Sequence, residues 1–157
     1  MKLLAHLHVL CKAEHGASLI ELALVTPILL LLMIGAVDLG RAYYVGLEVA
    51  NAAHSGAEYG SRNPSNTAGI TAAARQSAPN LPNMIVSAPA WGCECSDGSS
   101  YSASCTVTPT CTASSSRGAN VVHRVQVTTS SAYNPLMPWP YIPSSVTLSN
   151  TATVRGN

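Results

Sequence analysis

Apolar residues form one long block near the start of the chain and shorter runs toward its end. Residues 22–37 carry no charged side chain. The later runs, at 84–88, 121–129 and 146–154, are short, and in the last two apolar residues alternate with polar ones. A 3.6-residue period predicts a helix, and a two-residue period predicts a strand. The pattern therefore predicts an α+β fold, in which a long N-terminal helix packs on a small antiparallel sheet that is polar on one face.

The N-terminal block is long enough to cross a membrane once. As a helix, residues 17–37 span about 32 Å, close to the thickness of a hydrocarbon core of about 30 Å. Lys2 and Lys12 precede this block, and positive charge favours the cytoplasmic side of a membrane. We therefore expect residues 1–16 to be a cytoplasmic leader, residues 17–37 to be a transmembrane helix, and the rest of the chain to be exported.

The helix is expected to continue beyond the membrane as a stalk over residues 38–62. Its apolar side is expected to consist of Leu39, Tyr43, Leu47, Ala50 and Ala57. Its polar side is then made of Asp38, Arg41, Glu48, Asn51, Ser55, Glu58 and Arg62. Asp38 and Arg41 are spaced to form an ion pair. The helix should end at Asn63, because a residue that precedes proline is disfavoured in helical geometry.

Pro27 lies inside the membrane part of the helix. A proline there removes one backbone hydrogen bond and tends to bend the helix. The hydroxyl of Thr26 is a candidate to satisfy the carbonyl that the proline leaves free. The bend has either a packing role alone or a role in function.

Residues 63–157 are expected to form a small α+β domain. Thr67 is a candidate cap for a short helix that runs to Gln76. Two irregular stretches separate the expected strands. Residues 92–118 are rich in serine, glycine and cysteine and suggest a loop held by disulfides, whereas residues 134–143 contain four prolines, which forbid regular strand pairing.

The four prolines hold two aromatic residues, Trp139 and Tyr141, on a stiff arch. These two side chains either cover the core of the domain or form an exposed contact for a neighbouring subunit. Together with Trp91 they also suggest a third possibility, a stacking surface of a carbohydrate-binding adhesin.

The cysteines indicate the redox compartment. Cys11 stands alone in the leader, whereas four cysteines lie within 19 residues of the exported part: Cys93, Cys95, Cys105 and Cys111. An even number in an exported domain predicts two disulfides. A Cys93–Cys95 bridge would be strained, so we favour the nested pairing of Cys93 with Cys111 and Cys95 with Cys105, with the crossed pairing left open. A four-cysteine zinc site is a weaker alternative, because the spacing lacks the usual two-residue knuckle.

Composition bounds the remaining possibilities. The chain has 157 residues, of which 47% are hydrophobic and 10% charged, and its net charge is +1. About 120 residues remain outside the leader and the span, enough for one modest domain. The absence of a basic cluster in the exported part argues against nucleic acid as a partner. No nucleophile motif, phosphate loop or pair of catalytic carboxylates is present, so we expect no enzymatic activity, no catalytic residue, no cofactor, no metal and no small-molecule substrate.

Glu21 stands at the threshold of the apolar block. A carboxylate carried into the middle of a membrane costs about 3 kcal/mol, and a buried countercharge is the usual compensation. A cut between Gly16 and Ala17 would create an ammonium group one helical turn from Glu21. In a packed array of such helices, each Glu21 could then meet the Ala17 ammonium of a neighbour. Alternatively, Glu21 sits at the membrane interface without a partner.

These residues resemble a known family. The segment Gly16-Ala17-Ser18-Leu19-Ile20-Glu21 resembles the processing site of type IV prepilins. With Pro27, the segment Asp38-Leu39-Gly40-Arg41 and the alanine-rich stretch at 51–59, it is similar to the TadE-like pseudopilins of type IVb tight-adherence (Tad) pilus systems. The close resemblance covers about residues 14–60.

The resemblance implies a minor pilin-like subunit that a membrane prepilin peptidase cuts after Gly16. It implies a protein of the bacterial inner membrane with a periplasmic C-terminal domain, or a place in the extracellular pilus. Its partners would be membrane lipid, the peptidase, other pilin or pseudopilin subunits and the pilus assembly machinery, and its role would be assembly of fibres for cell adhesion. In the family, the recognised processing elements correspond here to Gly16 and Glu21. The chain departs from the family pattern at Leu22, where an aromatic residue is common, and at Glu14-His15, where basic residues are common.

An alternative is a periplasmic binding or adhesin domain that an ordinary signal sequence releases or holds at the membrane. Ile34-Gly35-Ala36 is an acceptable signal-peptidase site, and cleavage there would leave a chain that starts at Val37. Against this alternative, the long leader and the unbroken helical pattern across Val37 would have no purpose.

Overall fold

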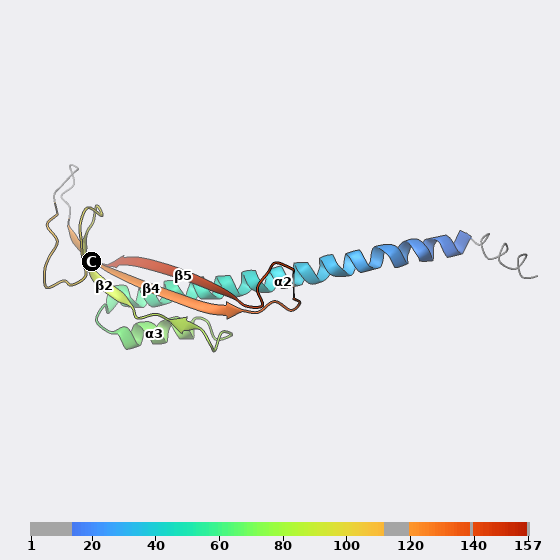
Figure 1. Cartoon of the computed structure of the whole chain (residues 1–157). Coiled ribbons are helices and arrows are strands. Elements are labelled where there is room, and N and C mark those ends of the chain that lie inside the picture. The colour runs from blue at the N-terminus through green and yellow to red at the C-terminus, as the bar shows by residue number, and fades with distance from the viewer. Residues whose placement is uncertain (1–13, 112–119, 139, 157) are drawn as a thin grey trace, which may run out of the picture. The chain divides into compact units, whose positions relative to one another are not determined.

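The computed structural model describes residues 14–111, 120–138 and 140–156, with side chains from Ser18 onward. The chain divides into two compact units, Met1–Arg41 and Ala42–Asn157. Helix α2 (Glu14–Arg62) provides the described part of the first unit and continues into the second (Figure 1). The predicted long N-terminal helix is therefore confirmed, and its described part includes residues 14–16, ahead of the expected span.

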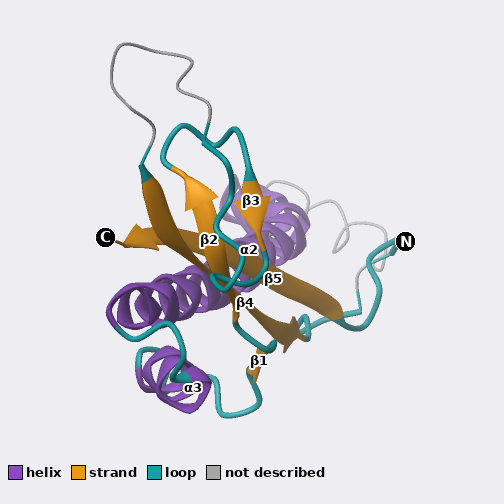
Figure 2. Ribbon diagram, turned by 90° about the vertical axis from the view of Figure 1, so that its left-hand side faces the viewer, coloured by secondary structure: helices purple, strands orange, loops and turns teal. Residues whose placement is uncertain are grey.

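The second unit contains one antiparallel sheet. Its strands are β1 (Ile85–Val86), β2 (Ala90–Cys95), β3 (Tyr101–Ser102), β4 (Val121–Tyr133) and β5 (Val146–Gly156). The long strand β4 is central: β5 pairs along one of its edges, β1 and β2 follow each other along the other edge, and β3 pairs with β2 (Figure 2). The α+β fold with a small antiparallel sheet is thus confirmed.

The strands extend into regions that the sequence pattern left irregular. Both β2 and β3 include residues from the stretch expected to be a loop, and β4 continues through Ser130 and Ser131 to Tyr133. Ser130 pairs with Ser149 and Ser131 with Leu148, so hydrogen bonding to β5 holds these residues extended. Strand pairing here overrides the weak strand preference of serine.

The short helix α3 (Thr67–Gln76) has the predicted range but a different cap. The side-chain oxygen of Asn66 accepts a hydrogen bond from the backbone N–H of Gly69 at 2.9 Å. Thr67, the predicted cap, is instead the first residue of the helix. An amide oxygen one residue earlier reaches the exposed N–H groups of the first turn, which is the usual geometry of an N-cap.

The core of the second unit lies between the inner face of the sheet, α2 and α3. Ala57, Ile70, Val125 and Val127 are fully buried and form one cluster. Gly60 of α2 allows this packing, because a Cβ atom added there would lie 2.6 Å from a methyl carbon of Val125. The hydroxyl of Thr129, also buried, donates to the carbonyl oxygen of Val49 and ties β4 to α2 at 2.7 Å.

The apolar side predicted for the stalk was wrong in its larger residues. Leu39, Tyr43 and Leu47 are 73%, 69% and 44% exposed. The buried face consists of Glu48, Val49, Ala52, Ala53, Gly56, Ala57 and Gly60. Most of these residues are small, so the helix backbone approaches the sheet closely, and the larger side chains lie outside the contact.

Candidate functional site

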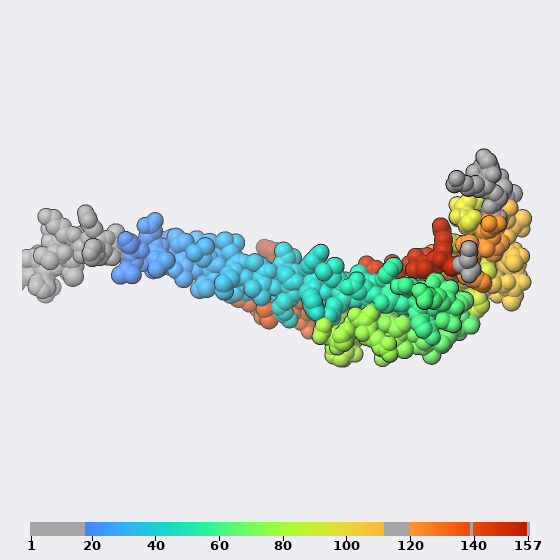
Figure 3. All heavy atoms as spheres, turned by 180° about the vertical axis from the view of Figure 1, so that it is seen from behind, coloured from blue at the N-terminus to red at the C-terminus, as the bar shows by residue number. Residues whose placement is uncertain are grey.

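The first unit presents an apolar helical surface. Between residues 18 and 37, the exposed large side chains range from 41% exposed at Val25 to 71% at Ile20 (Figure 3, blue). The most apolar window of this helix has no share buried inside the structure. Its length and composition are sufficient to cross a membrane, and they fit a single-pass membrane protein.

The residues expected to direct processing lie at the beginning of this helix. Gly16 and Ala17 are helical, and Glu21 follows Ala17 by one turn. The Glu21 side chain is exposed, and within the described part of the chain it forms no ion pair. Its carboxylate is therefore accessible to a charged group from another molecule.

Pro27 lies within α2, but the hydrogen bond next to it differs from the prediction. The hydroxyl of Thr26 donates to the carbonyl oxygen of Leu22 at 2.6 Å. The carbonyl that a proline leaves free is the one four residues before it, which here belongs to Ala23. The expected role of Thr26 was therefore wrong by one residue, because its side chain returns to the carbonyl four residues before its own position.

The predicted ion pair at the end of the first unit is confirmed. The Asp38 carboxylate and the Arg41 guanidinium lie 3.7 Å apart. The Asp38 side chain is only 7% exposed, although the helical pattern assigned it to a solvated face, whereas Arg41 is 48% exposed. The partial exposure of Arg41 limits the stabilisation from this pair to about 1 kcal/mol.

A second polar cluster joins the helix of the second unit to the loop after α3. Tyr44 donates to the Glu48 carboxylate at 2.6 Å, and the Asn80 amide donates to both, at 2.8 Å to Tyr44 and 2.6 Å to Glu48. Glu48 is 8% exposed, and its other oxygen has no hydrogen-bond partner among the described residues. The hydrogen bond to Glu48, and then burial, raise the pKa of Tyr44.

We expect Glu48→Gln to lower the pKa of Tyr44 toward the ordinary value of about 10. In the wild type, the raised pKa of Tyr44 stabilises the folded state at pH values below the ordinary tyrosine pKa. This stabilisation is lost as the pH rises through the pKa that Tyr44 has in the folded protein. Titration of tyrosinate absorbance, with Tyr44→Phe to assign the transition, measures the change. Glu58→Gln, at an exposed position of the same helix, is the control. Equal titration of the two glutamine variants would contradict the assigned cause.

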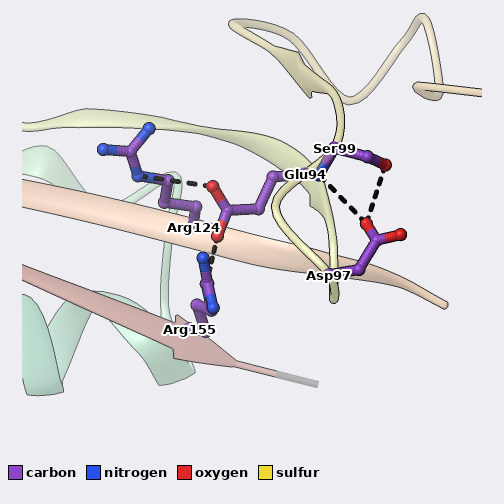
Figure 4. A network of polar contacts seen from close by, with 5 residues as sticks. All are labelled: Glu94, Asp97, Ser99, Arg124 and Arg155. Atoms are coloured by element: carbon purple, nitrogen blue, oxygen red, sulfur yellow. Dashed lines mark hydrogen bonds and ion pairs between the residues drawn. The ribbon is translucent and has the colours of Figure 1, made fainter. Parts of the chain in front are cut away.

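The sheet carries a third cluster, centred on a buried carboxylate. Glu94 of β2 is 5% exposed and lies between Arg124 of β4 and Arg155 of β5 (Figure 4). The Nε of Arg124 is 3.6 Å from one carboxylate oxygen, and the Nε of Arg155 donates to the other. The Arg124 guanidinium also lies 5.1 Å from the centre of the Tyr101 ring on β3. One carboxylate therefore connects three strands, a role that the sequence pattern missed.

The turn after β2 has its own local charge. The Asp97 carboxylate accepts hydrogen bonds from the backbone N–H of Ser99 at 3.0 Å and from its hydroxyl at 2.7 Å (Figure 4). The backbone bond first, and then the hydroxyl bond, lower the pKa of Asp97. These bonds stabilise the tight turn through which β2 leads into β3.

The two disulfides join Cys93 to Cys105 and Cys95 to Cys111. All four predicted cysteines are bridged, but the favoured nested pairing was wrong and the crossed pairing is present. The reason is the register of β3, which places Ser102 opposite Cys93. When the chain reaches Cys105 it has already passed the level of Cys95, so Cys105 meets Cys93, and the returning chain brings Cys111 to Cys95.

One histidine lies beside the first disulfide. The Nδ1 of His123 is 3.4 Å from the sulfur of Cys105 and 3.7 Å from that of Cys93. These three residues have the proximity of a metal-ligand set. Because both sulfurs share a disulfide, neither is a thiolate, and the zinc alternative loses its ligands.

Of the three aromatic residues proposed as a surface, Tyr141 and Trp91 lie in the described part of the chain and differ in exposure. Tyr141 is fully exposed, so it is not a lid over the core. Trp91 is partly buried and packs against the main cluster of the second unit, which removes it from an exposed stacking surface. Trp139 lies outside the described residues. A contact of Tyr141 with another molecule remains a prediction.

Comparison with known proteins gives one match. The family model described as TadE-like protein matches residues 16–58, from Gly16 to Glu58. No curated protein and no solved structure matches the chain. The sheet of the second unit lies outside the matched range. The match confirms the resemblance drawn from the residues around Glu21, and over residues 16–58 the chain is similar to the TadE-like family.

Proposed function

We propose that this protein is a minor pilin-like subunit, a pseudopilin, for assembly of a Tad-type type IVb pilus and for surface adhesion. A prepilin peptidase cuts the chain after Gly16, and the mature protein begins at Ala17. The observation that carries the proposal is the exposed apolar surface of residues 18–37 with the accessible Glu21 near its start. The family match supports an association with Tad pili and pilus components.

The physical basis of the proposal is that the apolar side chains of residues 18–37 must be shielded from water. Before assembly, lipid covers the apolar side chains, and in a fibre the equivalent helices of neighbouring pilin or pseudopilin subunits replace the lipid. Glu21 would lose hydration in both settings, at a cost of about 3 kcal/mol. The new ammonium group at Ala17 of a neighbour offsets this cost, because opposite charges attract strongly where water is excluded.

The proposed orientation places the leader in the cytoplasm and the second unit in the periplasm of a bacterial inner membrane. Lys2 and Lys12 in the leader support it through the positive-inside tendency. The two disulfides of the second unit also support it, since such bonds persist in oxidising compartments.

Two substitutions test the proposal in cells that hold an active prepilin peptidase and a Tad system. We expect Gly16→Leu to leave the leader attached, because a large side chain precedes the scissile bond. We expect Glu21→Ala to be cut normally but to assemble little or no pilus, because the mature helix lacks its countercharge. Mass spectrometry of the N-terminus reports cleavage, and electron microscopy reports piliation.

Matched controls exist on the same helix. Gly40→Leu adds the same side chain where a Cβ atom meets open space, and it should be cut normally. Glu58→Ala removes an exposed carboxylate 3.8 Å from Arg62 and should leave piliation unchanged. Intact Met1 in the wild-type protein would overturn the proposal, and a mature chain that begins at Val37 would establish ordinary signal-peptidase release instead.

A further inference from the structure

The loop that joins β4 to β5, residues 134–145, exposes apolar side chains. Met137 is 45% exposed, Ile142 is 51% exposed and Tyr141 is fully exposed. Tyr141 is also the one described residue other than glycine with a positive φ, at 70°. A tyrosine rarely adopts this backbone conformation, and here it accompanies a side chain that projects completely into the surroundings.

The hairpin formed by β4, the loop and β5 carries charged side chains only at the end remote from the loop. No Asp, Glu, Lys, Arg or His occurs between Arg124 and Arg155. These two arginines pair across β4 and β5, at the end of the hairpin remote from the loop. Four prolines in the loop also lack a backbone N–H group, so fewer donors would lose water if the loop entered an apolar region. The loop can therefore leave bulk water without burying a charge.

Contacts within the second unit show at which end the loop lies. Val125 of β4 lies against Gly60, and Thr129 binds the carbonyl of Val49. The strand thus runs toward earlier residues of the helix. Between Thr129 and Tyr133 the strand extends about 13 Å further in this direction, and an α-helix needs about nine residues to cover the same length. The loop is therefore at the end of the unit where the chain enters, at Ala42.

The membrane surface is close to this entry point along the chain. The apolar block ends at Val37, and Ala42 follows it after four intervening residues. Tyrosine and apolar side chains are favoured at the boundary between headgroups and acyl chains, where an aromatic ring has one apolar and one hydrated side. Lipid is therefore the partner that both the chemistry and the position of the loop favour.

We propose that the β4–β5 loop docks on the headgroup region of the membrane that the helix crosses, through Met137, Tyr141 and Ile142. The inference rests on the membrane-spanning helix but requires neither peptidase processing nor a pilus. A second, weaker attachment of this kind would restrain the second unit near the bilayer until the subunit leaves the membrane.

Site-directed spin labelling of the full-length protein tests this proposal. In a Cys11→Ser background, a nitroxide is attached at Ile142→Cys and, as a control, at Thr151→Cys on the exposed face of β5. The proteins are reconstituted in vesicles of phosphatidylcholine and phosphatidylglycerol, and collision rates with oxygen and with a water-soluble nickel complex are compared. We expect oxygen to dominate at position 142 and the nickel complex to dominate at position 151.

Three further results keep the test decisive. Mass spectrometry without reductant must find both native disulfides intact in the labelled proteins. If Ile142→Cys does not fold, Ser144→Cys gives a second label position on the same loop. Equal access of nickel to the loop and to position 151 would overturn the proposal. Protection of the loop that fades when the protein is diluted tenfold in lipid would also overturn it, because the covering partner would then be another copy of the chain.

Discussion

Ile70→Ala should lower the free energy of unfolding of the second unit by about 3 kcal/mol. Ile70 is fully buried, and it packs from α3 against Val125 and Val127 of β4 in one cluster. The shortened side chain loses apolar contact and leaves a cavity that Gly60, which lacks a side chain, cannot fill. Hydrogen exchange of the β4 amides in the full-length protein in detergent measures this loss.

The matched control is Ile85→Ala. Ile85 is 64% exposed on β1, so the same chemical change should alter the free energy of unfolding by less than about 0.5 kcal/mol. An equal loss in the two variants would show that α3 does not pack on the sheet as described. A large loss for Ile70→Ala alone would support the position of α3.

Glu94→Ala is expected to cost about 2 kcal/mol. Removal of one partner of a buried ion pair typically costs about 3–5 kcal/mol, because it leaves an uncompensated charge. The expected cost is smaller here because the side chains of Arg124 and Arg155 are 28% and 53% exposed and keep part of their hydration. The amide exchange that reports on Ile70 measures the loss.

The two arginines provide the internal comparison for Glu94. Arg124→Ala should cost more than Arg155→Ala, because Arg124 is the less exposed of the two and also stacks on the Tyr101 ring. In a double-mutant cycle, Glu94 should couple to both arginines. Additive effects within about 0.3 kcal/mol would mean that the cluster does not stabilise the sheet as a unit.

The local pattern of the sequence was sufficient for the long helix, the short helix and the two main strands. Uncharged residues 22–37 predict a membrane helix wherever they occur, since no water is available to hydrate a charge in a bilayer. The resemblance to a prepilin processing site is also local, because Gly16 and Glu21 lie on one short segment. These features depend on neighbours in the chain, so one sequence can reveal them.

The cysteine pairing and the polar clusters depended on the register between distant segments. Cys105 meets Cys93 because Tyr101 and Ser102 pair with β2. The local sequence around these two residues does not predict this pairing. Arg124 and Arg155 stand at the two ends of an uncharged stretch, and this pattern could have indicated from the sequence that they act together. Glu94 joins them only because β2 lies next to β4.

The sequence by itself determined an N-terminal helix long and apolar enough to cross a membrane, the four cysteines that form two disulfides and the similarity of residues 16–58 to the TadE-like family. The tertiary structure alone decided which face of the stalk is buried, because close approach to the sheet requires glycine and alanine rather than the larger Leu39 and Tyr43. It likewise decided that Glu48 and Glu94 are buried. Periodicity ranks residues by polarity, whereas burial depends on the elements that pack against them.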